Sequence, residues 1–92
     1  MELTVTKIPN AFTPNGDGIN ETWVIPSIDN YPDAVIRIYD RHLQQIIQYT
    51  GMDPGWDGRD SYGVPLPTGA YLYIINLDKG GRPIKGYVSL VR

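Results

Sequence analysis

Glycine and proline interrupt this chain so often that no regular element can be long. The 92 residues include 10 glycines and 8 prolines, two residue types that disfavour helix interiors and form turns. Between the turn signals, apolar residues alternate with polar ones, and no stretch keeps the 3.6-residue apolar spacing of a helix. This pattern predicts an all-β chain of short strands.

The segments with the strand pattern are Glu2–Ile8, Glu21–Ile25, Asp33–Tyr39, Gln44–Tyr49, Ala70–Leu77 and Pro83–Val91. Short polar links predict hairpin pairing of the third with the fourth and of the fifth with the sixth, the latter through the turn Asp78–Gly81. Ala70–Leu77 is apolar on both faces, which predicts a central strand. Gly51–Thr68 has room only for turns and one or two bridging residues. We expect a small Ig-like β-sandwich of about six to seven mostly antiparallel strands.

Length, charge and composition limit the class of protein. The length predicts a single domain over residues 1–92, and Met1, which leads directly into a strand pattern, is interpreted as an added start residue on a fragment. The net charge of −2 and the scattered Lys and Arg residues argue against nucleic-acid binding. No apolar run reaches the ~20 residues of a membrane-spanning helix. The absence of cysteine excludes disulfides and thiolate zinc sites.

Residues that could support catalysis do not form a recognisable set. His42 is the single histidine and falls in a polar hairpin turn, and no serine stands in a nucleophile motif. Asp53, Asp57 and Asp60 could supply paired carboxylates, but their glycine, proline and tryptophan neighbours favour roles in turns. We therefore do not expect an enzyme.

The string FTPNGDGI, which begins at Phe12, predicts a rigid and polar loop. Its proline fixes one φ angle, its glycines can take positive φ, and Asn15 and Asp17 can hydrogen-bond their own backbone. Calcium is the chemical alternative, because Asn15, Asp17 and Glu21 alternate as ligands do in an EF-hand loop. Thr13 and Val24 stand where two acidic ligands belong, so we expect a metal-free turn and no cofactor.

Aromatic residues in a domain of this size usually fill the space between the sheets. We expect Trp23, Tyr71 and Tyr73 in the core, and the ring of Trp56 folded over a sheet end. The positions predicted to determine the fold are Trp23, Pro67, Gly69, Tyr71 and Tyr73.

Several strings occur in one order along the chain: FTPNGDGINETW from Phe12, YP at Tyr31, VIRIYDR from Val35, WDGRDSYG from Trp56, LPTGAYLYII from Leu66 and KGYVSLVR from Lys85. Together they resemble the gliding-motility-associated C-terminal domain, the type B sorting domain of the type IX secretion system of Bacteroidota. The sequence departs from this family at the turn RHLQQ, where His42 and Leu43 stand in place of a glycine that usually follows the arginine.

The resemblance implies a non-catalytic C-terminal sorting signal of a larger secreted protein. It would direct an N-terminal cargo domain through the periplasm and across the outer membrane to the cell surface or medium. The implied partners are the type IX translocon and an outer-membrane protein of the PorP/SprF type, with the domain itself a monomer.

We expect the partner to read a rigid surface made of the FTPNGDGI loop and the WDG turn, with the residues Phe12, Pro14, Asn15, Gly16, Asp17, Gly18, Trp56, Asp57 and Gly58. Addition of a strand to an unpaired sheet edge is a second route. The alternative functions are a carbohydrate-binding or adhesion module, with calcium bracing its loop, and a structural spacer.

Overall fold

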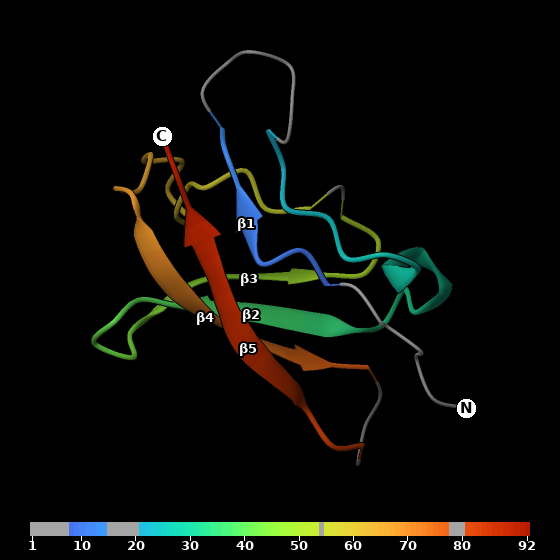
Figure 1. The fold of residues 1–92 in the computed structure, drawn as a ribbon. Helices are drawn as coiled ribbons and strands as arrows, with labels where there is room; N and C mark the ends of the chain where they lie inside the picture. Colours follow the sequence, from blue (N-terminus) through green and yellow to red (C-terminus); the bar gives the residue numbers. More distant parts are fainter. Residues whose placement is uncertain (1–7, 15–20, 54, 78–80) are drawn as a thin grey trace.

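The computed structural model describes residues 8–14, 21–53, 55–77 and 81–92 (Figure 1). Its elements are β1 (Ala11–Phe12), the 3-10 turn η1 (Ile28–Asn30), β2 (Val35–Tyr39), β3 (Gln45–Thr50), β4 (Gly69–Asn76) and β5 (Ile84–Leu90). The strands form one sheet in the order β1-β5-β4-β2-β3. The all-β prediction is confirmed.

Both predicted hairpin pairings are present. Strand β2 pairs antiparallel with β3, with a register shift after Ile38, and β4 pairs antiparallel with β5 from Gly69 opposite Leu90 to Ile75 opposite Ile84. Strand β4 also pairs with β2, so it is central, as its two apolar faces predict. The short β1 runs parallel to β5. The predicted strand Glu2–Ile8 and the turn Asp78–Gly81 fall almost wholly outside the described residues.

The predicted strand Glu21–Ile25 is wrong, because only one of its residues pairs. Trp23 forms an isolated antiparallel bridge with Trp56, in which N–H to O distances are 2.7 and 3.1 Å. The partner segment turns away immediately after Trp56, at Gly58 with φ of 82°, so no ladder can extend. The described part of Gly51–Thr68 otherwise lacks strands, as predicted, although it has three bridging residues, Trp56, Arg59 and Pro65, where one or two were expected.

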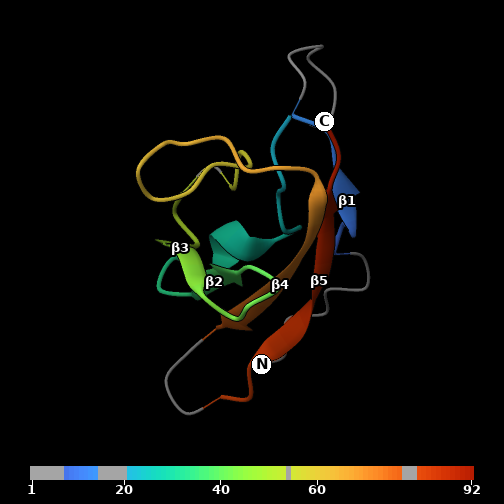
Figure 2. The same ribbon diagram turned by 90° about the vertical axis from the view of Figure 1, so that its left-hand side faces the viewer.

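The second layer of the fold, within the described residues, consists of connections. Residues 21–34 and 51–68 lie on the same side of β4 and β5 (Figure 2), and the bridge between Trp23 and Trp56 joins them. The face of the sheet that these connections cover is the inner face.

The core lies between the inner face and these connections. Its buried members are Phe12, Trp23, Ile25, Ile28, Ala34, Ile36, Ile38, Trp56, Tyr71, Tyr73, Ile75, Val88 and Leu90. The ring centroid of Trp23 lies 5.0 Å from that of Tyr73, and the centroid of Trp56 lies 5.4 Å from that of Tyr71. Trp23, Tyr71 and Tyr73 are thus buried, as a position in the core requires. Trp56, whose ring was expected over a sheet end, is itself buried in the core.

The start of β4 is held by its tyrosine. The Tyr71 hydroxyl donates a hydrogen bond to the carbonyl of Pro67, four residues earlier, at 2.7 Å. This is the arrangement of the tyrosine corner found in Ig-type sandwiches. It links two positions of the string LPTGAY through a backbone carbonyl at a proline.

Candidate recognition surface

The residues predicted for recognition do not all reach the surface. Phe12 is 2% exposed and Trp56 is 1% exposed, with their ring centroids 5.2 Å apart. Turn context had suggested surface positions, but a large apolar ring is stabilised by burial. Their side chains therefore support the fold and cannot meet a partner directly.

The other positions predicted for recognition differ in their exposure to solvent. Pro14 is partly exposed, Asp57 is exposed and Gly58 is buried, while the stretch 15–18 lies outside the described residues. The Asp57 carboxylate accepts a hydrogen bond from the backbone N–H of Arg59, and the two side chains form a 3.7 Å ion pair that is more than half exposed. An ion pair of this kind contributes little to stability.

Gly58 is required by the space around it. Its φ is 82°, and a Cβ placed there would lie 2.9 Å from Cδ1 of Leu90 and 3.2 Å from Cγ of Pro14. Positive φ and the close approach of two side chains both favour glycine at this position. The WDG turn thus packs against the end of β5 and the start of the FTPNGDGI loop.

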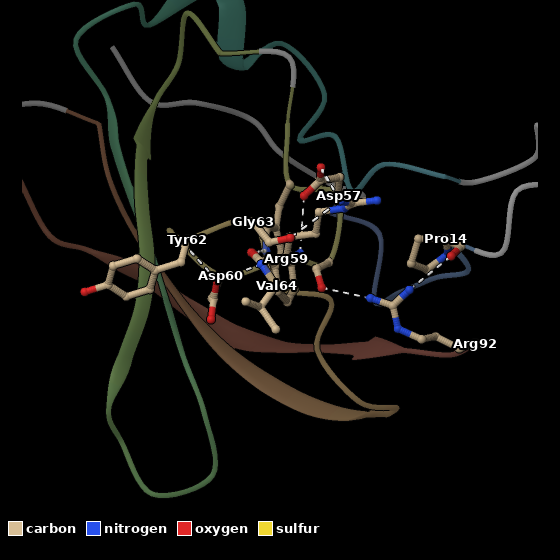
Figure 3. A network of polar contacts seen from close by, with 10 residues as sticks. Pro14, Asp57, Arg59, Asp60, Tyr62, Gly63, Val64 and Arg92 are labelled. Carbon is tan, nitrogen blue, oxygen red and sulfur yellow. Dashed lines mark hydrogen bonds and ion pairs between the residues drawn. The ribbon is translucent and has the colours of Figure 1, made fainter.

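Arg92 joins three separate segments on the surface, and Figure 3 shows its contact with Pro14. Its guanidinium donates from Nε to the carbonyl of Leu66 at 2.6 Å, from Nη1 to Pro14 at 3.2 Å and from Nη2 to Gly58 at 2.9 Å. Its backbone N–H donates to the Thr68 hydroxyl at 3.0 Å. A single arginine carries no signal in the sequence, so this role was not predicted.

The predicted turn aspartates do form turns. Asp60 Oδ1 accepts the backbone N–H groups of Tyr62 and Val64 at 2.9 and 3.0 Å (Figure 3). Asp53 Oδ2 accepts the Thr50 N–H at 2.8 Å. These carboxylates satisfy backbone donors, which is the usual role of Asp in turns.

Among the described residues, no group of three or more His, Asp or Glu could hold a metal ion. The proposed calcium ligands Asn15 and Asp17 lie outside that range.

The turn between β2 and β3 shows how the chain replaces the usual glycine. Leu43 takes a φ of 61°, a conformation that favours glycine. The Asp40 carboxylate accepts the backbone N–H groups of His42 and Gln44 at 2.8 and 3.0 Å. These hydrogen bonds offset the strain at Leu43.

Among the described residues, hollows beside the sheet do not bring together a set of catalytic side chains. One, of about 600 Å³, lies between the turn after β2 and the start of β4 and includes His42 and Thr68. In the part of the chain that is described, no side chain is hydrogen-bonded to the His42 ring. The other, of about 480 Å³, lies beside β3 and includes Tyr49. Burial, and then the nearby Asp53 carboxylate, raises the pKa of the Tyr49 hydroxyl, so it stays protonated.

The free edge of β3 offers little backbone to a partner strand. At one end, the Thr50 N–H and C=O bond to Asp53. At the other end, the Ile46 carbonyl accepts the N–H of Ser61 at 3.2 Å. Strand addition requires a row of unpaired groups, so this edge is poorly suited to it.

The outer face of the sheet, opposite the core, carries two rows of side chains that follow from the strand register. Tyr39, Leu72 and Tyr87 lie opposite one another across β2, β4 and β5. Arg37, Ile74 and Lys85 form the next row. Tyr87 is 68% exposed, Lys85 is exposed and the other four are partly exposed. We call these six residues the outer-face rows.

The tyrosine corner, the largely antiparallel sheet and the buried tryptophan pair define a small Ig-like domain without disulfides. The sequence model of the CHU_C type IX secretion signal domain matches residues 6–90, and the chain belongs to this family. No curated protein matches the chain significantly.

This family assignment confirms the resemblance and defines the function. A type IX secretion signal domain is a sorting signal that directs an attached cargo protein through the type IX secretion system to the cell surface or medium. It is not a catalytic family, and the carbohydrate-binding alternative is not favoured. Among the described residues, no helix is long and apolar enough to cross a membrane.

Proposed function

We propose that this domain is a folded label without catalytic activity, cofactor or metal. It passes through the periplasm as a monomer, and an outer-membrane protein of the PorP/SprF type receives it for the translocon. The observation that carries the proposal is the family match over residues 6–90, which spans every strand of the sheet.

The fold supports recognition as a rigid body. The chain has a radius of gyration of 12.6 Å, close to the ~13 Å of a compact 100-residue domain. Arg92 ties the residues around Pro14, Gly58 and Leu66 together. A surface that is ordered before binding loses little conformational entropy when the partner engages it.

Export of a fusion protein tests the proposal. A secretory signal peptide, a fluorescent reporter and this domain are joined in that order and expressed in a cell with a working type IX system. We expect reporter fluorescence at the cell surface or in the medium. In cells without the translocon, or without the cognate PorP/SprF-type protein, the reporter should remain in the periplasm. Retention in the competent cell with the cognate partner present would contradict the proposal.

A further inference from the structure

We propose that the outer-face rows are the surface through which the domain docks on the secretion machinery. The occupant is a folded protein surface that presents apolar side chains surrounded by carboxylates. This inference rests on the proposed function and adds to it the face that is read and the chemistry of the reader.

The outer face is apolar at positions where the fold itself does not need apolar residues. Along β4, Tyr71, Tyr73 and Ile75 are buried on the inner face, while Leu72 and Ile74 alternate with them and point outward. A sheet with one face in water normally carries polar residues there. Here Leu72 lies directly between Tyr39 and Tyr87 in the register, so the apolar positions are contiguous across three strands.

Nothing in the described part of the chain covers these positions. The connections 21–34 and 51–68 lie over the inner face (Figure 2), where Trp23 and Trp56 contact the inner tyrosines Tyr73 and Tyr71. Tyr87 keeps 68% of its surface exposed. A contiguous apolar patch with one exposed and three partly exposed members fits an interaction site.

The charge on this face indicates the partner's chemistry. Arg37 and Lys85 are the charged residues at outward positions of the described strands, and no carboxylate is among them. The acidic residues in the described part of the chain all lie in connections, outside the strands. Arg37 donates to Asn76 Oδ1 at 3.0 Å, a neutral partner, and no carboxylate among the described residues forms an ion pair with it. Two cations beside an apolar row complement a surface with carboxylates, and such complementarity steers association and fixes orientation.

The other surfaces considered for recognition are less suitable. The side chains of Phe12 and Trp56 are buried, and the edge of β3 is bonded at both ends to the following connection. The outer-face rows combine exposure, apolar character and charge of one sign.

Matched charge substitutions in the reporter fusion test the inference. Tyr87→Glu and Lys85→Glu change the outer face at exposed positions. Tyr62→Glu, at a tyrosine that is 90% exposed in a turn, and Arg41→Glu, in the turn after β2, are the controls. We expect the two outer-face variants to lower the exported fraction of reporter by about tenfold or more, because like charges across an interface are strongly unfavourable. The controls should stay within about twofold of wild type, and all four variants should keep the wild-type melting temperature within a few degrees, as surface substitutions usually do.

Each outcome decides a different question. Wild-type export from the Tyr87→Glu and Lys85→Glu fusions would overturn the docking face and leave the proposed function standing, and so would an equal loss in all four variants. Retention of the wild-type fusion would defeat the proposed function itself. Glycan binding that Tyr87→Glu abolishes, with export unchanged, would identify the face as a sugar platform and overturn the inference.

Discussion

Strand β4 is apolar on both faces, but only one of those faces is packed in the described structure. Tyr71 and Tyr73 contact the tryptophans of the second layer and Ile75 is fully buried, whereas Leu72 and Ile74 lie on the open side of the sheet between β2 and β5. Folding alone explains the first set, because burial of apolar area stabilises the domain. Folding alone does not explain why Leu72 and Ile74 are apolar. Their apolar character fits a surface that contacts a partner protein.

The largest expected effect on stability comes from substituting two adjacent isoleucines that lie on opposite faces of β4. Ile75 is fully buried and Ile74 is partly exposed. We expect Ile75→Ala to lower the free energy of unfolding by about 2–5 kcal/mol, because it leaves a cavity in the core. Ile74→Ala should cost about 1 kcal/mol or less, since part of the side chain is already in water. Urea denaturation of the two variants measures both values. Equal losses would mean that the two faces are packed alike.

Comparing alanine substitutions at two glycines separates the cost of backbone strain from the cost of overpacking on the inner side. Gly58 and Gly63 have φ of 82° and 83°. A Cβ at Gly58 would press on Leu90, while one at Gly63 meets no atom within 4 Å. We expect Gly63→Ala to cost about 1–2 kcal/mol from strain, and Gly58→Ala to cost a further ~1–3 kcal/mol from overpacking. Thermal unfolding of both variants gives the difference. If Gly63→Ala were the more destabilising, the packing of the WDG turn against β5 would be refuted.

Alkaline pH should lower the stability of the folded domain because of the buried tyrosines on the inner face. Burial raises the pKa of Tyr71 and of Tyr73 above the ordinary value of 10.0. As the pH rises past about 10, the unfolded chain loses these protons while the folded domain keeps them, so the free energy of unfolding falls. It should be constant with respect to these groups below that pH. Urea midpoints measured from pH 8 to 11 test this, and Tyr73→Phe should reduce the decline. A decline that Tyr73→Phe leaves untouched would exclude a contribution from Tyr73.

Arg92 should have the smallest effect on stability. Arg92→Gln removes at least two of its three guanidinium bonds to carbonyls, but the residue is exposed, so the loss should be about 1 kcal/mol. Exchange of the Leu66 amide, which donates to Gly58 at 2.9 Å, should become faster in Arg92→Gln. The β2–β3 hairpin, which Arg92 does not contact, should exchange as in wild type. Unchanged exchange at Leu66 would show that Arg92 does not hold these segments together.

Local patterns in the sequence were sufficient to predict the hairpins, the central strand and the place of Tyr71 in the core. Alternation defined the two faces of each strand, but the hydrogen bond from the Tyr71 hydroxyl to the Pro67 carbonyl was not predicted. The segment Glu21–Ile25 had a similar local pattern, but a strand also needs a partner of matching length, and the turn after Trp56 provides only one paired residue.

The surface was harder to predict, because burial depends on contacts between distant segments. Phe12 and Trp56 stand in turn-rich strings, yet their rings meet across the molecule. The three carbonyls that Arg92 contacts come from segments far apart in the sequence. The outer-face rows could be recognised only once the order of β2, β4 and β5 was known.

The proposed sorting signal is the folded sheet, and not a linear string such as FTPNGDGI. Its most direct test compares export of the wild-type reporter fusion with that of Ile75→Asp, which buries a carboxylate in the core and leaves every surface residue unchanged. We expect the wild-type fusion to reach the cell surface or medium, while the variant, unfolded by this substitution, remains inside. Export of the unfolded Ile75→Asp fusion at the wild-type level would contradict it.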